Sequence, residues 1–208
     1  MTRLAAICAL IKKADVIADV GCDHGRVAEY IVKNGLADKT IASDISDKCL
    51  DKARARLSGY AGVEFICCDG LNYECDEAVI AGMGGFTVIG IIERAKKKPT
   101  SLIICAHRDT YEVRKSLVSL GYRIAYDSMI EERGRFYSII RAELCEDKTE
   151  LSELQYLFGV NWTEQSEALD KYLLGLHKTY MRAADRNAEK LHFVREALKI
   201  RGVPEITN

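Results

Sequence analysis

The sequence lacks several features that would place it in a special class. Its 208 residues contain no apolar run near the ~18 residues that a membrane-spanning helix needs, no tandem repeat and no low-complexity segment. Net charge is also nearly absent, because 30 Lys and Arg face 31 Asp and Glu. This balance argues against a uniformly basic surface, although a total does not describe how charge is distributed. With 48% hydrophobic residues and only 2 prolines, we expect an ordinary globular protein with a sizeable core.

No two of the 8 cysteines have the Cys-x-x-Cys spacing of zinc sites and thioredoxin-like motifs. We therefore expect free, mostly buried thiols and no metal site. Residues 4–11 are apolar, but Lys12, Lys13 and Asp15 follow without a small-x-small cleavage site, which favours a short amphipathic helix over a signal peptide. Unpaired thiols and the absence of a membrane span together predict a cytoplasmic protein.

From Val16 onward, short apolar runs alternate with longer amphipathic stretches, which is typical of βαβ units around a parallel sheet. The predicted strands cover residues 16–20, 40–44, 63–67, 77–81 and 101–106. The predicted helices cover residues 25–33, 46–58, 86–95 and 111–120, with Ser46 as an N-cap and Gly121 as a C-terminal stop. Two further β-rich runs, 122–130 and 136–142, predict an antiparallel hairpin. The expected fold is α/β and Rossmann-like, with parallel strands followed by this hairpin.

The strand pattern ends after Glu143. Residues 151–160 and 164–201 both predict helices, and apolar residues in the second recur at steps of three and four. Such spacing favours a helical hairpin or a coiled coil. We therefore divide the chain into a sheet domain, residues 1–145, and a helical tail, residues 146–208.

A tight turn follows the first predicted strand in V-I-A-D-V-G-C-D-H-G, with glycines at Gly21 and Gly25. A dinucleotide site would read G-x-G-x-x-G, but the third position here is Asp23, whose charge would repel a pyrophosphate. A nicotinamide dehydrogenase is therefore disfavoured. Asp19 and Asp23 instead suit a ligand with a cationic amino or sulfonium group.

Acidic residues also follow the next two strands. Asp44 ends the second strand 23 residues beyond Gly21, about where a carboxylate accepts hydrogen bonds from ribose hydroxyls. Asp69, followed by Gly70, comes after the third strand and could receive an adenine amino group. Any one of these acids could be a turn or cap residue. Three in order at the carboxyl ends of successive parallel strands favour a nucleoside site.

These motifs, D-V-G-C-D-H-G, S-D-I-S and C-D-G-L with A-V-I-A-G-M-G-G, resemble those of class I S-adenosylmethionine methyltransferases. With G-Y-R-I, E-E-R-G-R-F-Y and the tail sequence L-S-E-L-Q-Y-L-F-G, the whole chain resembles the bacterial TrmK-type tRNA (adenine-22-N1)-methyltransferases. The resemblance implies S-adenosylmethionine as cofactor, tRNA as partner, and methyl transfer to N1 of an adenine, adenine 22 in the D-arm region. The implied cofactor-binding residues are Asp19, Gly21, Asp44, Ile45, Asp69, Gly70, Gly82, Met83 and Gly84.

The glycine-rich loop would end at Gly85, where a flat base must approach the methyl group closely. Where the resembled family usually has Q-P-N after the fifth strand, this chain has Cys105, Ala106 and His107, so the base contact of that asparagine is in doubt. A neutral imidazole could replace it, because it both donates and accepts. A solvated loop histidine, an altered substrate or lost activity are the alternatives.

Three residues are candidates for stabilising charge or accepting a proton at the reacting base. They are Asp23, His24 and His107. His24 could equally cap its helix or hold its loop. Phe86 and Tyr137 are candidates for stacking on an exposed base, with core packing as the alternative.

Charge in the tail is strongly polarised. Residues 146–170 hold seven acids and one lysine, whereas residues 171–201 hold eight basic residues and three acids. A single helix would align four of these basic residues, spaced four apart, in one phosphate-binding stripe: Lys178, Arg182, Arg186 and Lys190. A solvated helix face is the alternative.

Four arginines on loops near the sheet edge are further candidates for substrate phosphates: Arg26, Arg108, Arg133 and Arg135. Two other functions remain open at this stage. One is a non-catalytic RNA-binding protein that keeps the fold, and the other is a methyltransferase for a small molecule.

Overall fold

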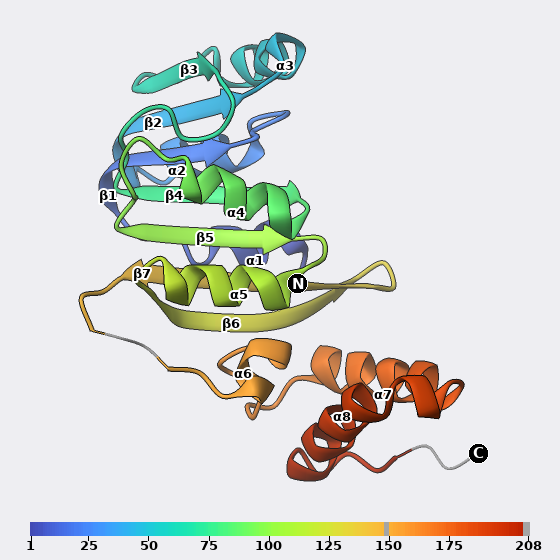
Figure 1. The fold of residues 1–208 in the computed structure, drawn as a ribbon. Coiled ribbons are helices and arrows are strands. Elements are labelled where there is room, and N and C mark those ends of the chain that lie inside the picture. The colour runs from blue at the N-terminus through green and yellow to red at the C-terminus, as the bar shows by residue number, and fades with distance from the viewer. Residues whose placement is uncertain (148–149, 206–208) are drawn as a thin grey trace.

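A single mixed sheet forms the centre of the protein (Figure 1). The computed structural model describes residues 1–147 and 150–205. Seven strands lie in the order β3-β2-β1-β4-β5-β7-β6, and β7 runs antiparallel to both of its neighbours. The strands are β1 (Ala14–Val20), β2 (Ala37–Asp44), β3 (Val63–Cys67), β4 (Glu77–Met83), β5 (Ser101–Ala106), β6 (Tyr122–Glu132) and β7 (Arg135–Leu144).

The predicted α/β architecture is confirmed, and so are the five parallel strands and the hairpin. Strand β1 begins two residues before its predicted start, β2 begins three residues earlier, and β4 continues two residues further. The β6–β7 turn is shorter than predicted, because pairing continues to Glu132 opposite Arg135. Only Arg133 and Gly134 remain between the strands, and both have a positive φ, as a two-residue type I′ turn requires.

Helices cover both faces of the sheet. One face carries α4 (Gly85–Glu93) and α5 (Thr110–Ser119), and the other carries α1 (Arg3–Cys8), α2 (Arg26–Lys33) and α3 (Asp47–Leu57). Alternate residues of β5 enter the two cores, since Leu102 and Ile104 pack on the α4 side and Ile103 on the α1 side. A strand buried on both faces is the expected location for such a continuous apolar run.

The tail consists of α6 (Glu153–Phe158), α7 (Glu167–Met181), a 3₁₀ turn (Ala184–Arg186) and α8 (Ala188–Ile200). One continuous helix over residues 164–201 is therefore wrong, and the hairpin alternative is correct. The chain leaves helical geometry at Ala183, where φ is −145°. Folding back lets Leu169 and Leu173 of α7 pack with Val194 and Leu198 of α8, whereas a single helix would expose this apolar stripe.

A buried arginine of the sheet domain forms an ion pair there and also bonds to the tail. The Arg114 guanidinium of α5 donates from Nε to Asp127 of β6 at 2.6 Å, and both side chains are 1% exposed. The same guanidinium donates to the backbone carbonyl of Tyr156 in α6 at 2.9 Å. Because Asp127 fixes the guanidinium in place, its charge-assisted hydrogen bond to Tyr156 links α6 to the sheet domain. Within the described residues, no helix combines the length and hydrophobicity needed to cross a membrane.

Candidate active site

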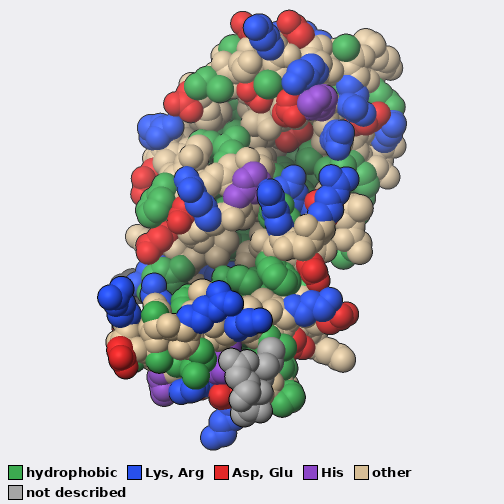
Figure 2. Space-filling view, turned by 90° about the vertical axis from the view of Figure 1, so that its right-hand side faces the viewer, with side chains coloured by type: hydrophobic (Ala, Val, Ile, Leu, Met, Phe, Trp, Pro, Cys, Tyr) green, Lys and Arg blue, Asp and Glu red, His purple; other side chains and the backbone are tan. Residues whose placement is uncertain are grey.

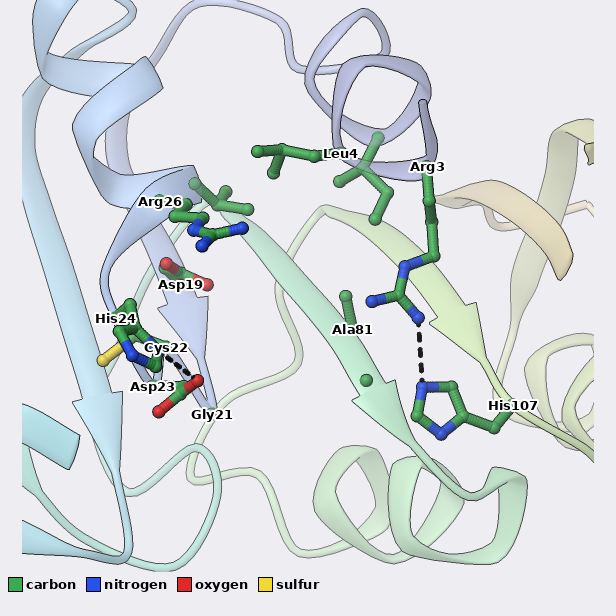
Figure 3. Close-up of a pocket in the computed structure, with 13 residues that line it drawn as sticks. Arg3, Leu4, Asp19, Gly21, Cys22, Asp23, His24, Arg26, Ala81 and His107 are labelled. Atoms are coloured by element: carbon green, nitrogen blue, oxygen red, sulfur yellow. Dashed lines mark hydrogen bonds and ion pairs between the residues drawn. The ribbon is translucent and has the colours of Figure 1, made fainter. Parts of the chain in front are cut away.

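Two cavities adjoin at the edge where the parallel strands end. The smaller, of about 270 Å³, lies near the ends of β2 and β3, and the larger, of about 450 Å³, lies between α1, α2 and β4 (Figure 3). They share Gly21, Ala81 and Gly82 as lining residues. The turn after β1 and the end of β4 therefore separate two connected compartments.

Asp44 is fixed at the smaller cavity by the local backbone. Its carboxylate accepts the N–H of Ser46 at 2.9 Å and the N–H of Asp23 at 3.1 Å. Each oxygen keeps a lone pair for a ligand hydroxyl. The apolar side chain of Ile45, which is 71% exposed, lines the same cavity and offers a surface for a planar ring.

The remaining lining of the smaller cavity favours a nucleoside over a phosphate. Asp69 lies on the far side, with only an exposed ion pair to Arg94 at 3.3 Å, which is weak enough to yield to a ligand. The described lining includes no Lys, Arg or His that could neutralise a phosphate. Asp44 and Asp69 thus line one cavity, as their positions after successive parallel strands predicted.

Glycines shape the passage between the two compartments. Gly21 has a φ of +71°, and a Cβ there would collide with the side chain of Met83. Gly82 has a φ of +83° and open space where its Cβ would be. Gly85 differs, because it is buried and a Cβ would lie 2.7 Å from the carbonyl oxygen of Arg108. Its missing side chain lets α4 pack on the loop after β5, whereas Gly82 lines both cavities and leaves room for a ligand.

Asp19 is the buried acid of the larger cavity. It is 5% exposed and accepts the N–H of Ala28 at 3.1 Å. Desolvation, aided by the nearby Asp44 charge and opposed by the Ala28 hydrogen bond, raises the pKa of Asp19 to about 7. The carboxyl is therefore poised to ionise when a cation enters, which fits the expected amino or sulfonium ligand.

Asp23 and His24 form a carboxylate–imidazole pair beside Asp19. Asp23 has a φ of +44°, and its side chain lies 2.5 Å from Nδ1 of His24 and 3.2 Å from Nζ of Lys52. Desolvation raises the Asp23 pKa, but the hydrogen bonds from His24 and Lys52 outweigh it and hold the pKa below its usual value. An ionised Asp23 orients His24 and leaves Nε2 available as a base.

The larger cavity includes one residue that sequence reasoning missed. Arg3 of α1 lines it, and its guanidinium lies 3.2 Å from Nε2 of His107 and 4.8 Å from the centroid of the Tyr137 ring. No local pattern marks Arg3, because its partners come from the loop after β5 and from β7. The Arg3 contact covers Tyr137, whereas Phe86 is 66% exposed at the start of α4. Of the two predicted stacking residues, Phe86 is thus the accessible one.

The predicted phosphate-binding residues lie in two groups. Arg26 lines the larger cavity, Arg108 is exposed beside it, and Arg133 and Arg135 are exposed at the β6–β7 turn. The four basic tail residues are exposed but do not form the predicted stripe, because Lys178 lies on α7, Lys190 on α8, and Arg182 and Arg186 between them. Figure 2 shows basic side chains around the histidines of this face and again over the tail.

Fold and site together define a class I methyltransferase domain. The strand order, the ribose-type acid after β2 and the cation-free nucleoside cavity are the features of that class. A family model described as a methyltransferase domain matches residues 1–140, and the chain belongs to this family.

Within that family the chain is of the TrmK type. It is 30% identical to the tRNA (adenine(22)-N(1))-methyltransferase of Bacillus subtilis over 151 residues, which cover 68% of this chain and 63% of that protein. It superposes on M. capricolum TrmK bound to S-adenosyl-homocysteine with a TM-score of 0.82 and 26% identity, covering 97% and 96% of the two chains. The B. subtilis m1A22 tRNA methyltransferase TrmK shares the fold at a TM-score of 0.72 and 24% identity, with 97% and 96% covered.

Proposed function

We propose that this protein transfers the methyl group of S-adenosylmethionine to N1 of an adenine in tRNA, adenine 22 by its family relationship. The observation that carries the proposal is the pair of adjoining compartments: an acidic nucleoside cavity opens past Gly21 and Gly82 into a cavity containing Asp23, His24 and His107. Such an arrangement allows a nucleoside-bearing donor and a second planar base to meet at one point.

The residues present fit S-adenosylmethionine. Asp44 would accept hydrogen bonds from the ribose hydroxyls, Asp69 would receive the adenine amino group, and Ile45 would cover the adenine ring. Asp19 and Asp23 would face the positive end of the molecule. When bound, S-adenosylmethionine supplies a methyl group on a sulfonium sulfur, which leaves as a neutral thioether.

The protein's contribution to the reaction is mainly orientation. N1 is a nucleophile through its own lone pair, so no covalent intermediate with the protein is needed. The methylated base is cationic until its amino group loses a proton, and the Asp23–His24 pair is placed to stabilise that charge and accept the proton. Because N1 lies on the Watson–Crick edge, the base must be unpaired or flipped, and the exposed Phe86 is available to stack on it.

The RNA would lie across the face that contains both groups of basic residues. Arg26 and Arg108 would hold phosphates beside the target base, and Arg133 and Arg135 would do so at the β6–β7 turn. The exposed basic residues of the tail, Lys178, Arg182, Arg186 and Lys190, would extend this contact, with residues 146–208 as the RNA-binding unit. A cytoplasmic location belongs to the same proposal and is supported by the eight unpaired cysteines.

The direct test is incubation with labelled S-adenosylmethionine and unmodified tRNA, followed by mapping of reverse-transcription stops. N1 methylation blocks base pairing, so a labelled product should stop the polymerase one nucleotide before the modified adenine. Absence of both label and stop would refute the enzymatic function. If tRNA still bound without methylation, the non-catalytic RNA-binding alternative would replace it.

A second test concerns the ribose contact. Asp44→Ala should abolish measurable cofactor binding in equilibrium dialysis, because the carboxylate is the acceptor for two hydroxyls. Asp38→Ala is the matched control, since this exposed acid lies in β2, near the opposite end of the strand. Equal cofactor affinity of the two variants would show that Asp44 does not bind the ribose.

The RNA surface has its own matched pair of variants. The double change Arg133→Gln and Arg135→Gln should weaken tRNA binding and reduce its dependence on salt. Lys96→Gln with Lys98→Gln removes the same charge from the end of the sheet remote from the cavities. Identical losses in both double variants would show that binding depends on total charge and not on the β6–β7 turn.

A further inference from the structure

The contact between Arg3 and His107 determines which hydrogen-bonding form the imidazole can take. Arginine has only donor groups and stays protonated, so the 3.2 Å contact between its guanidinium and Nε2 requires Nε2 to accept. An imidazole that accepts at Nε2 is neutral and carries its hydrogen on Nδ1. His107 is thus held as a neutral donor through Nδ1.

The surroundings of His107 fix its position as well as its form. Its backbone N–H donates to the carbonyl of Met83 at 2.9 Å, which ties it to the glycine loop after β4. Its ring meets Tyr137 edge to face, with the ring centroids 6.1 Å apart, and the Arg3 guanidinium lies over the same Tyr137. Three segments of the chain therefore fix one imidazole at the wall of the larger cavity.

Arg3 is itself anchored. Its backbone N–H donates to Glu132 at 2.9 Å, and the Thr2 hydroxyl caps α1 by accepting the N–H of Ala5 at 3.2 Å. Charged groups near the imidazole come from α1, β6, β7 and the loop after β5: Arg3, Glu132, Arg135 and Arg108. Desolvation first, and then the charges of Arg3 and Arg135, lower the pKa of His107, which agrees with a neutral ring.

His107 lines the compartment assigned to the target base, and Arg3 occupies only one of its two ring nitrogens. In Figure 3 the nitrogen that contacts Arg3 points toward α1, and the other ring nitrogen lies on the edge of the ring away from Arg3. Among the described residues, Nδ1 has no hydrogen-bond partner. A neutral donor there suits a ring nitrogen of a purine, such as N3 or N7, and leaves the N1 lone pair free for reaction.

We propose that His107 contacts the target adenine as a neutral hydrogen-bond donor through Nδ1, and that Arg3 is the positioning residue that keeps it in this form. The inference rests on the proposed function, because it takes the second base to be an adenine. Helix α1 then contributes to substrate recognition through Arg3, which acts on the base by way of His107.

The first test measures the imidazole itself. Long-range proton–nitrogen NMR on imidazole-labelled protein, with His107 assigned by its absence in His107→Asn, should show the Nδ1–H form in the parent. In Arg3→Met the ring should lose this preference and titrate at a higher pH, whereas Arg3→Lys keeps a donor at Nε2 and should restore it. Lys13→Met, which removes a charge from the same end of the chain, is the control and should change neither property. An Nε2–H form in the parent, or equal spectra for the parent and Arg3→Met, would overturn the proposal.

The second test measures methyl transfer to tRNA. Arg3→Met should lower kcat/KM about tenfold, the value of one well-placed hydrogen bond, and Arg3→Lys should recover most of it. His107→Asn retains an N–H donor and should stay well above His107→Leu, while cofactor affinity is unchanged in all four. Equal activity of His107→Asn and His107→Leu would overturn the base contact. A parent with the Nδ1–H form but no transfer to tRNA would instead refute the proposed function.

Discussion

Asp19→Asn should stabilise the protein, and increasingly so as the pH rises. Burial raises the pKa of Asp19 to about 7, far above the ordinary value of an aspartate. The folded state therefore holds a proton at pH values where the unfolded chain has released it. A raised acidic pKa contributes stability that is present below the unfolded value and is lost as the pH rises through the folded value. Asparagine keeps an oxygen for the Ala28 N–H and has no charge to bury.

The size of this stabilisation follows from the pKa shift of Asp19. Relative to an unfolded pKa of about 3.9, a rise of ~3 units corresponds to ~4 kcal/mol of unfolding free energy well above pH 7. Between about pH 6 and pH 8, the advantage of Asp19→Asn over the parent should widen by ~1 kcal/mol, because the unfolded carboxyl is already ionised while the folded one keeps its proton until the pH passes about 7. Above that pH the gap should level off.

Urea unfolding of both proteins at these two pH values measures the difference directly. Asp38→Asn, a change at an exposed acid, should show no such widening. If Asp19→Asn were no more stable than the parent at pH 8, or if the gap did not grow with pH, the Asp19 carboxyl would not be a buried, destabilising charge. Addition of S-adenosylmethionine should narrow the gap at pH 8, because only the parent offers a carboxylate to a cationic ligand.

Three other substitutions probe the packing around the site and the tail. Gly85→Ala should destabilise the protein by about 1–3 kcal/mol in thermal or urea unfolding, because the new Cβ would lie 2.7–2.8 Å from the backbone and Asp109. Gly159→Ala should cost a similar amount, since Gly159 has a φ of +98° and its Cβ would lie 2.8 Å from Asp127; unchanged stability would show that the tail junction can relax. Arg201→Lys should loosen the tail alone, because it removes a guanidinium that bonds Asp170 at 2.6 Å and three backbone carbonyls; hydrogen exchange should quicken in α7 and α8 and stay constant in the sheet.

The short apolar runs in the sequence were enough to predict the strands of the sheet. Runs such as residues 102–106 are apolar throughout, and a strand covered by helices on both faces requires that composition, so the central strands could be located without tertiary information. The acids after successive strands were placed correctly for the same reason. Once the strands are parallel, Asp44 and Asp69 must end at one edge.

The features that the sequence did not predict depend on contacts between segments that are far apart in the chain or on packing against the backbone. The break at residues 182–187 has no proline or glycine, and it arises because the two halves of the tail bury their apolar faces against each other. Gly85 was interpreted from its motif as a ligand contact, but its space is needed by the backbone of Arg108 and Asp109. Arg3 could not be found at all, since its partners lie more than 100 residues away along the chain.

That separation has a consequence for how the protein matures. Arg3 is made well before its hydrogen-bond partners, which are 104 and 129 residues later in the chain. During synthesis from the N-terminus, α1 must wait until the β6–β7 hairpin is complete before it can take its final position, because contacts of such long range form late in folding. The rim of the cavity is thus closed by two segments that are synthesised at widely separated times. A nascent or truncated chain can build β1 to β5 and still present an open, unfinished pocket.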